Sequence, residues 1–172
     1  MKFKSFISTV LIVITINSLS AYFKDKIIFN YTFSIPFGLY KVEKNINSLE
    51  IGDIVTFNIK KYPIIYNRIH EDITFSKYIC AKYNDVVENR NGCIYINDIF
   101  KGEILKEDSE GKPISSILKR KTILKKDELF LMGSSKNSFD SRYYGAIKKK
   151  DIIYKLKPLL IFNGGVLNEK EK

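Results

Sequence analysis

Segment 32–40 places a serine at a stiff bend between two extended stretches. It reads Thr-Phe-Ser-Ile-Pro-Phe-Gly-Leu-Tyr, with Ser34 two residues before Pro36. Pro36 fixes its own φ and biases the preceding residue towards an extended conformation, and Gly38 lets the chain turn again. A serine held at such a bend has little freedom to lose when a substrate binds, which suits a nucleophile. The alternative is an ordinary turn residue, because serine is common in turns.

A lysine on the apolar face of a predicted strand is the candidate base for that serine. Residues alternate from 73 to 82, and on one face four of five side chains are apolar while the fifth is Lys77. Burial lowers the pKa of a lysine. A neutral amine can then activate a serine without a histidine. The alternative places Lys77 at a sheet edge, with its ammonium group reaching water.

A third group of polar residues follows a predicted strand and is rich in hydroxyls. Residues 133–145 read Gly-Ser-Ser-Lys-Asn-Ser-Phe-Asp-Ser-Arg-Tyr-Tyr-Gly. Asp140 and Arg142 are close enough in sequence to pair across a turn, and Asp140 could also accept backbone N–H bonds. A hydroxyl in this segment could hold a lysine amine in line with a serine. The alternative is a polar loop whose residues cap one another.

Histidine and cysteine are too scarce for a zinc site of the usual spacing, so we expect no metal and no cofactor. The single histidine, His70, lies among polar and charged residues, which indicates an exposed loop rather than a catalytic base. Cys80 and Cys93 lie in strands that flank a predicted hairpin. In an oxidising compartment they could form a disulfide, and the alternative is two small buried thiols.

These candidate residues must be positioned by short strands, because the body of the chain predicts a mainly β fold in one domain. The turn Asn-Arg-Asn-Gly at 89–92 predicts a β-hairpin, and Asn97-Asp98 predicts a second turn. Pro63 makes 62–66 an edge strand or a loop, and 106–113 is predicted to be a solvated loop. Strands are predicted at 38–44, 52–59, 73–82, 85–88, 93–96 and 129–132, and with mixed character at 143–147 and 151–161.

The N-terminal residues predict a membrane anchor. Lys2 and Lys4 precede an apolar run from Phe6 to Phe23, whose length is near the lower limit for crossing a bilayer. Positive charge before the run predicts that the N-terminus is cytoplasmic and the remainder is outside. The alternative is a cleaved signal peptide, with Ser18 and Ser20 before the cut.

We therefore divide the chain into a signal anchor at 1–23, with one transmembrane helix, and a domain at 24–172 whose tail is polar from about 163. The net charge of +10 results from 29 Lys and Arg against 19 Asp and Glu among 172 residues. Such a charge allows contact with anionic lipid headgroups or nucleic acid. Because no recognition-helix or zinc-finger pattern is present, we expect membrane lipid as a partner and no nucleic acid.

The motifs together resemble the signal peptidase I superfamily, whose serine peptidases use a Ser–Lys dyad. The chain is most similar to the conjugative-transfer (TraF-type) peptidases, over about residues 1 to 160. The resemblance is carried by the Ser-x-Pro motif at 34–36, the Gly-Asp-x-Val strand opening at 52–55, the lysine segment at 76–87 and the Ser-x-Asp-Ser-Arg-Tyr-x-Gly block at 138–145. It implies a signal-peptidase-like β domain.

The resemblance also implies a role for each candidate residue. Ser34 would be the nucleophile and Lys77 the general base. The Thr32 hydroxyl and the Ser34 N–H would stabilise the oxyanion. Ser138 would orient the lysine amine, and Asp140 with Arg142 would brace the site.

The implied function is a membrane-anchored serine endopeptidase that processes exported precursor proteins. Its substrate would be a prepilin or another component of conjugation or type IV secretion. The protein would cross the cytoplasmic (inner) membrane once, with its catalytic domain in the periplasm. Two alternatives stay open: a general secretory signal peptidase I, and a catalytically silent, membrane-anchored scaffold protein of a secretion complex.

Overall fold

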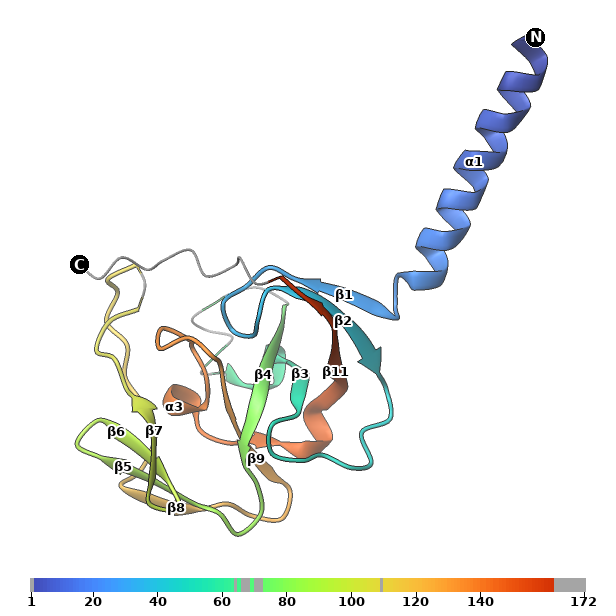
Figure 1. The fold of residues 1–172 in the computed structure, drawn as a ribbon. Helices are drawn as coiled ribbons and strands as arrows, with labels where there is room; N and C mark the ends of the chain where they lie inside the picture. Colours follow the sequence, from blue (N-terminus) through green and yellow to red (C-terminus); the bar gives the residue numbers. More distant parts are fainter. Residues whose placement is uncertain (1, 64, 66–68, 70–72, 109, 163–172) are drawn as a thin grey trace.

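A long helix projects from a body of β-strands (Figure 1). The computed structural model describes residues 2–63, 65, 69, 73–108 and 110–162. The helical elements are α1 Lys2–Phe23, η1 Ile59–Lys61, α3 Ser141–Tyr144 and η2 Lys149–Asp151. The strands are β1 Ile27–Asn30, β2 Gly38–Glu43, β3 Ile54–Asn58, β4 Thr74–Ala81, β5 Val86–Arg90, β6 Cys93–Ile96, β7 Ile99–Glu103, β8 Lys121–Ile123, β9 Glu128–Met132, β10 Ile147–Lys148 and β11 Ile152–Ile161.

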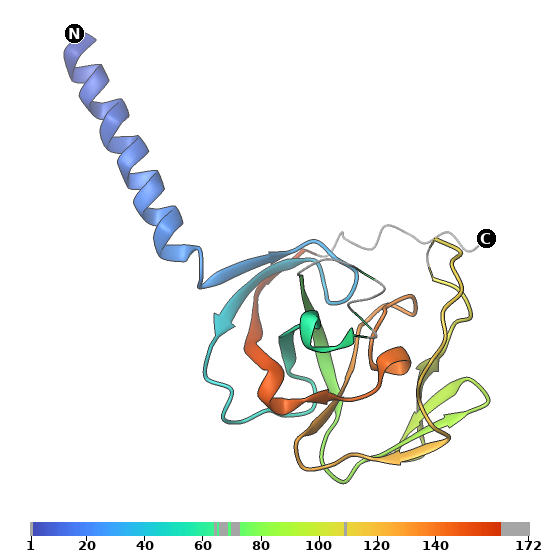
Figure 2. The same cartoon turned by 180° about the vertical axis from the view of Figure 1, so that it is seen from behind.

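Within the described residues the strands form two antiparallel sheets. A seven-stranded sheet has the order β1-β2-β11-β3-β4-β9-β10, and a four-stranded sheet has the order β7-β6-β5-β8. Figure 2, seen from behind, shows β11 beside β2 and β3, although it comes last in the chain. The mainly β fold predicted from the sequence is therefore confirmed.

Strand β4 lies inside the larger sheet, between β3 and β9. Its buried residues are Lys77, Ile79 and Ala81, so every second side chain faces the interior, as the alternation predicts. Ile79 belongs to the main apolar core, which also contains Phe57 and Leu131 from the neighbouring strands. Because both edges of β4 are paired, Lys77 cannot reach water over a sheet edge.

The predicted turns are present. β5 and β6 are joined through Asn91 and Gly92, with φ of 55° and 87°, and β6 and β7 through Asn97 and Asp98, with φ of 49° and 66°. Two successive residues with positive φ match the right-handed twist of a hairpin. The sequence does not single out β1, β7 or β8, which are short or, in β7, interrupted by Gly102.

Gly38 has a different role from the one predicted. It starts β2, and its φ does not lie in the left-handed region. A Cβ atom at this position would lie 2.2 Å from the carbonyl oxygen of Leu160, so glycine is needed for the close approach of β11. The register of β11 against β2 shifts between Pro158 and Leu160 at this point.

Segment 143–147, predicted as a mixed strand, divides into the end of α3 and the beginning of β10. The Asp140 side chain caps α3 by accepting a hydrogen bond from the Arg142 N–H, at 3.1 Å. The predictions for His70, for part of 62–66 and for the polar tail from 163 lie outside the described residues.

The two cysteines are free thiols, so the disulfide considered for Cys80 and Cys93 is not formed. They lie in different sheets: Cys80 on β4 and Cys93 at the first position of β6. Cys80 packs beside the apolar cluster that contains Phe130 and Met132. Burial raises the pKa of the Cys80 thiol, which favours the unreactive protonated form.

The helix predicted for the N-terminal residues is present as α1. Two of its polar side chains bond back to the helix: Thr15 donates to the Leu11 carbonyl and Asn17 to the Val13 carbonyl, each at 2.8 Å. A search of the described residues found no helix with both the length and the apolar character required to cross a membrane.

Candidate active site

The bend that carries Ser34 connects β1 to β2, and both of its flanks are fixed. Asn30 pairs with Gly38 across the two strands, which closes the loop at its base. Ile35 is 1% exposed and packs in an apolar cluster with Tyr40. The Tyr40 hydroxyl donates to the Pro36 carbonyl at 2.6 Å. Ser34 is therefore displayed by a loop whose next residues are anchored in the interior.

The end of β9 docks against the same bend. The Ser134 N–H donates to the Ser34 carbonyl at 2.9 Å, and the Ser134 hydroxyl donates to the Phe33 carbonyl at 3.2 Å. In a trans peptide the C=O and the N–H point in opposite directions. Fixing the Phe33 carbonyl therefore also fixes the direction of the Ser34 N–H. Among the described residues, that N–H has no hydrogen-bond acceptor.

Lys77 reaches the serine from β4. It is 3% exposed, and its Nζ atom is hydrogen-bonded to Ser34 Oγ and, at 2.8 Å, to Ser138 Oγ. Burial is the largest cause that lowers the pKa of Lys77, to about 8, and the Arg142 charge lowers it further. The Asp140 charge opposes both effects. A substantial fraction of this amine is therefore neutral near pH 8.

Ser138 reaches Lys77 because a glycine lies opposite it. A Cβ atom on Gly133 would lie 2.1 Å from Ser138 Oγ and 2.6 Å from Ser138 Cβ. The absence of a side chain at the end of β9 therefore creates the space that Ser138 occupies. Ser138 is 7% exposed, so its contact with Lys77 is shielded from water.

Asp140 and Arg142 form a buried, bidentate ion pair behind Ser138. Arg142 Nε donates to Asp140 Oδ1 at 2.8 Å, and Nη2 donates to Oδ2 at 2.9 Å. Their exposed fractions are 0% and 2%. Asp140 Oδ2 also accepts the Gly133 N–H at 2.9 Å. Such a pair is stable in the interior only when its remaining hydrogen-bonding groups are satisfied.

The remaining N–H donors of the Arg142 guanidinium group form hydrogen bonds with backbone carbonyls. Nη1 and Nη2 donate over 3.0–3.2 Å to the carbonyls of Glu103, Ser135, Lys136 and Ser138. Three of these carbonyls belong to the loop between β9 and α3. One guanidinium group thus fixes the path of the loop that brings Ser138 to Lys77.

The structure therefore places the predicted Ser34, Lys77 and Ser138 in one hydrogen-bonded chain, with the Asp140–Arg142 pair behind it. Thr32 is exposed, and its hydroxyl donates to Asn30 Oδ1 at 2.8 Å. Its role towards an oxyanion stays a prediction.

Three residues that position this chain of hydrogen bonds were not predicted from the sequence. The Asn30 side chain donates hydrogen bonds to carbonyls of the bend that carries Ser34. Gly133 leaves the space that Ser138 occupies, and Ser134 donates hydrogen bonds to two carbonyls of the bend. An asparagine just before a turn is a recognisable signal, because its side chain bonds nearby backbone groups. The contacts of Ser134 join residues about 100 positions apart in sequence. The contact of Gly133 with Ser138 depends on how the loop after β9 folds back, so no local pattern reveals either of them.

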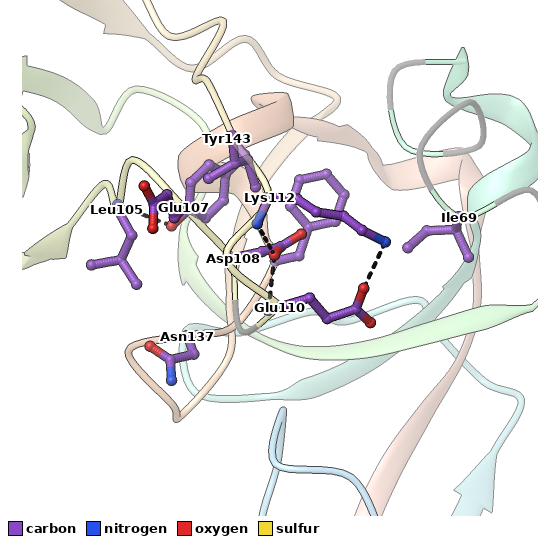
Figure 3. A pocket seen from close by; sticks show the side chains of 10 residues that line it. Ile69, Leu105, Glu107, Asp108, Glu110, Lys112, Asn137 and Tyr143 are labelled. Carbon is purple, nitrogen blue, oxygen red and sulfur yellow. Dashed lines mark hydrogen bonds and ion pairs between the residues drawn. The ribbon is translucent and has the colours of Figure 1, made fainter. Parts of the chain in front are cut away.

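A separate pocket of about 380 Å³ borders the loop between β9 and α3, which contributes Asn137 to its lining (Figure 3). Asp108 accepts the backbone N–H groups of Glu110 and Lys112 at 2.9 Å, and the Lys112 ammonium pairs with Glu110 at 2.6 Å. The pocket shares its wall with the loop that carries Ser138, but neither Ser34 nor Lys77 lines it. Its lining residues are Ile69, Leu105, Glu107, Asp108, Glu110, Lys112, Ile114, Asn137, Phe139 and Tyr143.

Comparison with known proteins shows that one family model matches the part of the chain that contains these motifs. Residues 3–160 match the model described as signal peptidase, peptidase S26. A solved structure of a signal peptidase I from Enterococcus faecalis is similar, with 19% identity and a TM-score of 0.42, over 66% of this chain and 100% of that chain. A search of curated proteins gave no match.

Proposed function

The chain belongs to the signal peptidase family, peptidase S26, and from this premise we propose that Ser34 and Lys77 are its catalytic dyad. The family consists of serine peptidases that process exported precursor proteins. The observation that carries the proposal is the hydrogen bond from the buried Lys77 Nζ to Ser34 Oγ. A base within hydrogen-bond reach of a hydroxyl and with a pKa near the working pH meets both requirements for activating a nucleophile.

In the first chemical step, neutral Lys77 takes the proton of the Ser34 hydroxyl while Ser34 Oγ attacks the scissile carbonyl carbon. The Ser138 hydroxyl orients the amine through the 2.8 Å contact. The carbonyl oxygen becomes an oxyanion. The Ser34 N–H and the Thr32 hydroxyl stabilise it, and such a donor contributes on the order of 3 kcal/mol.

In the second step the tetrahedral intermediate collapses. The C–N bond breaks, and the Lys77 ammonium group gives its proton to the leaving amine. This leaves an acyl ester on Ser34 and a neutral Lys77. Water, or another amine, then attacks the ester, Lys77 again takes and returns a proton, and Ser34 is released.

We propose a prepilin or another component of conjugation or type IV secretion as the substrate, cut after a small residue. The similarity of the Ser-x-Pro-x-Gly-Leu-Tyr segment and of the 138–145 block to TraF-type peptidases supports this choice. We also propose that α1 keeps the enzyme at the cytoplasmic membrane with the catalytic domain in the periplasm. The positive charge of Lys2 and Lys4 before the apolar run supports this orientation.

The experiment expresses the full chain with a prepilin and, separately, with a general secretory precursor. Ser34→Ala and Lys77→Ala should fold and lose processing, whereas the controls Ser48→Ala and Lys44→Ala should retain it. Processing by either dyad variant would contradict the assignment. Preferential cleavage of the secretory precursor would favour the general signal peptidase over the proposed substrate.

A serine-directed covalent probe separates an enzyme from a silent scaffold. We expect mass spectrometry to find the label on Ser34 in the wild type and no label in Ser34→Ala. Equal labelling of both proteins, or of neither, would support the scaffold.

A further inference from the structure

The Asn30 side chain lies under the bend that carries Ser34. It is only 9% exposed and is the last residue of β1. Its Nδ2 group donates to the carbonyls of Thr32, Ile35 and Pro36, at 2.9, 3.0 and 3.2 Å. Its Oδ1 atom accepts the Thr32 hydroxyl at 2.8 Å and the Thr32 N–H at 3.4 Å. One carboxamide therefore contacts the bend on both sides of Ser34.

The chemistry of these partners fixes the orientation of the amide group. A primary amide has two N–H donors, so the three carbonyls share them. Carbonyl oxygens only accept hydrogen bonds, so Nδ2 must face them and Oδ1 must face Thr32. A flipped amide would place its oxygen against three carbonyl oxygens and its NH2 group against the Thr32 N–H, which would lose its acceptor.

These contacts determine how the nucleophile is displayed. The carbonyls of Ile35 and Pro36 accept hydrogen bonds from Asn30 Nδ2. The carbonyl of Ser34 accepts a hydrogen bond from the Ser134 N–H. Successive peptide planes on both sides of Ser34 are therefore held. Ser34 Oγ is left facing Lys77, and its N–H has no acceptor among the described residues.

The Asn30–Thr32 contact also bears on the oxyanion. Rotation about the Cβ–Oγ bond of Thr32 moves only the hydroxyl proton and leaves the oxygen in place. Asn30 Oδ1 holds that proton before the reaction, and a developing oxyanion can compete for it. The position of the Thr32 oxygen is thus maintained while its proton stays available.

We propose that Asn30 is a positioning residue for the acylation step: its carboxamide holds the backbone on both sides of Ser34 and keeps the Thr32 hydroxyl at the oxyanion side. This rests on the proposed function, because it assumes that Ser34 is acylated. Asn30 acts through Ser34 and Thr32 and does not contact Lys77. Its loss should slow acylation without changing the protonation of the base.

The test measures the rate of Ser34 acylation by a serine-directed probe in the full chain, together with the pH dependence of that rate. Asn30→Ala should acylate about 10–100-fold more slowly than the wild type, because small displacements of a reacting group have effects of this size. The midpoint of the pH profile should stay at about 8, the pKa of Lys77. Asn30→Asp should be at least as slow, because it places a carboxylate against carbonyl oxygens and near the oxyanion.

The matched control is Asn89→Ala. Asn89 Oδ1 accepts the Gly92 N–H at 2.9 Å in the hairpin of the four-stranded sheet, so the variant also loses an asparagine contact with a turn. It should acylate at the wild-type rate. If Asn30→Ala fails to fold, Asn30→Ser, which keeps one hydroxyl donor, takes its place and should show an intermediate rate.

Two results would overturn the proposal. One is an Asn30→Ala acylation rate within about twofold of the wild type. The other is a slow rate accompanied by a pH midpoint that moves towards the ordinary lysine value of 10.5, which would show that the variant merely admits water to Lys77. If the wild type itself is not labelled at Ser34, the proposed function fails first, and the role of Asn30 fails with it.

Discussion

At the scale of single residues, the site depends on keeping one lysine away from water. Lys77 is 3% exposed and its Nζ atom contacts two serine hydroxyls. Desolvation disfavours the ammonium form and lowers the pKa of Lys77. The charges of the nearby Asp140–Arg142 pair act in opposite directions, because Asp140 raises this pKa and Arg142 lowers it. A base of this kind is active when it is neutral, so its pKa sets the pH range of the reaction.

The first prediction concerns this pH range. Because burial lowers the pKa of Lys77 to about 8, the neutral fraction and the kcat/KM for a peptide substrate should rise as pH increases, with a midpoint near 8. An exposed lysine would become neutral only near 10.5. The measurement is a profile of kcat/KM against pH from 6 to 10. A flat profile, or one that falls through this range, would contradict Lys77 as the base.

The second prediction concerns Arg142. Arg142→Lys keeps the positive charge but cannot reproduce the bidentate contact with Asp140 and the carbonyl contacts of the guanidinium group. We expect a loss of roughly 3 kcal/mol in the free energy of unfolding, the size seen when a buried pair is disrupted. Denaturant unfolding measures it.

Arg90→Lys is the matched control for Arg142→Lys. Arg90 pairs with Glu88 and Asp98, but its side chain is 41% exposed. Exposed pairs contribute about 1 kcal/mol or less, so this variant should unfold almost like the wild type. Equal losses in the two variants would show that burial does not set the importance of Arg142.

At the scale of elements, the site forms where the end of β9 meets the β1–β2 bend. The Ser134 N–H donates a hydrogen bond to the Ser34 carbonyl, and the Ser134 hydroxyl donates one to the Phe33 carbonyl. The Gly133 N–H donates a hydrogen bond to the Asp140 carboxylate. β9 also pairs with β4, the strand that carries Lys77. The end of one strand therefore fixes the distances between Ser34, Lys77 and the loop with Ser138.

The third prediction tests this junction. Gly133→Ala places a Cβ atom 2.1 Å from Ser138 Oγ, so Ser138 must move away from Lys77. We expect at least a tenfold loss of kcat, together with a loss of stability in the 1–3 kcal/mol range typical of overpacking. Steady-state kinetics and thermal unfolding measure the two effects.

A double-mutant cycle checks the cause. Ser138→Gly removes both atoms of the closest clash, so Gly133→Ala should cost less stability in that background than in the wild type. Strictly additive losses would show that the Gly133–Ser138 contact is not the reason for the glycine.

The elements themselves were predictable to different degrees. The alternation from 73 to 82 predicted β4 and the buried face that carries Lys77, because period-two geometry is local. The turns at Asn91 and Asn97 were also predictable, because the residues that favour a turn are adjacent in the sequence. β1 and β8 were not, because strands of three or four residues owe their existence to the neighbours with which they pair.

At the scale of the whole molecule, α1 stands apart from the β-strands (Figure 1). Many of its apolar side chains are exposed, among them Leu11, Ile12 and Ile16 at 58–62%. The sheets and their cores are formed by residues that follow it. Folding of the β domain and the proposed attachment of α1 to a membrane should therefore be separable.

The fourth prediction follows from this separation. A variant that lacks residues 1–23 should unfold within about 2 °C of the full chain, a shift that corresponds to less than about 1 kcal/mol. It should still cleave a soluble peptide and should leave the membrane fraction. Differential scanning calorimetry, a peptide assay and membrane fractionation measure these properties. A large drop in unfolding temperature would show that α1 supports the domain.

From the amino-acid sequence alone we predicted the residues proposed for the chemistry. The bend at Ser34, the apolar face that includes Lys77 and the block that contains Ser138 are local patterns, and local geometry dictates them. How these segments meet follows from the folded structure and not from the local patterns. The separations among them are set by the contacts of Asn30 within the bend, of Gly133 with Ser138, and of the buried Arg142 guanidinium with the loop carbonyls. The physical reason is that the separation of Ser34 and Lys77 depends on the pairing of strands far apart in the chain, which no local pattern encodes.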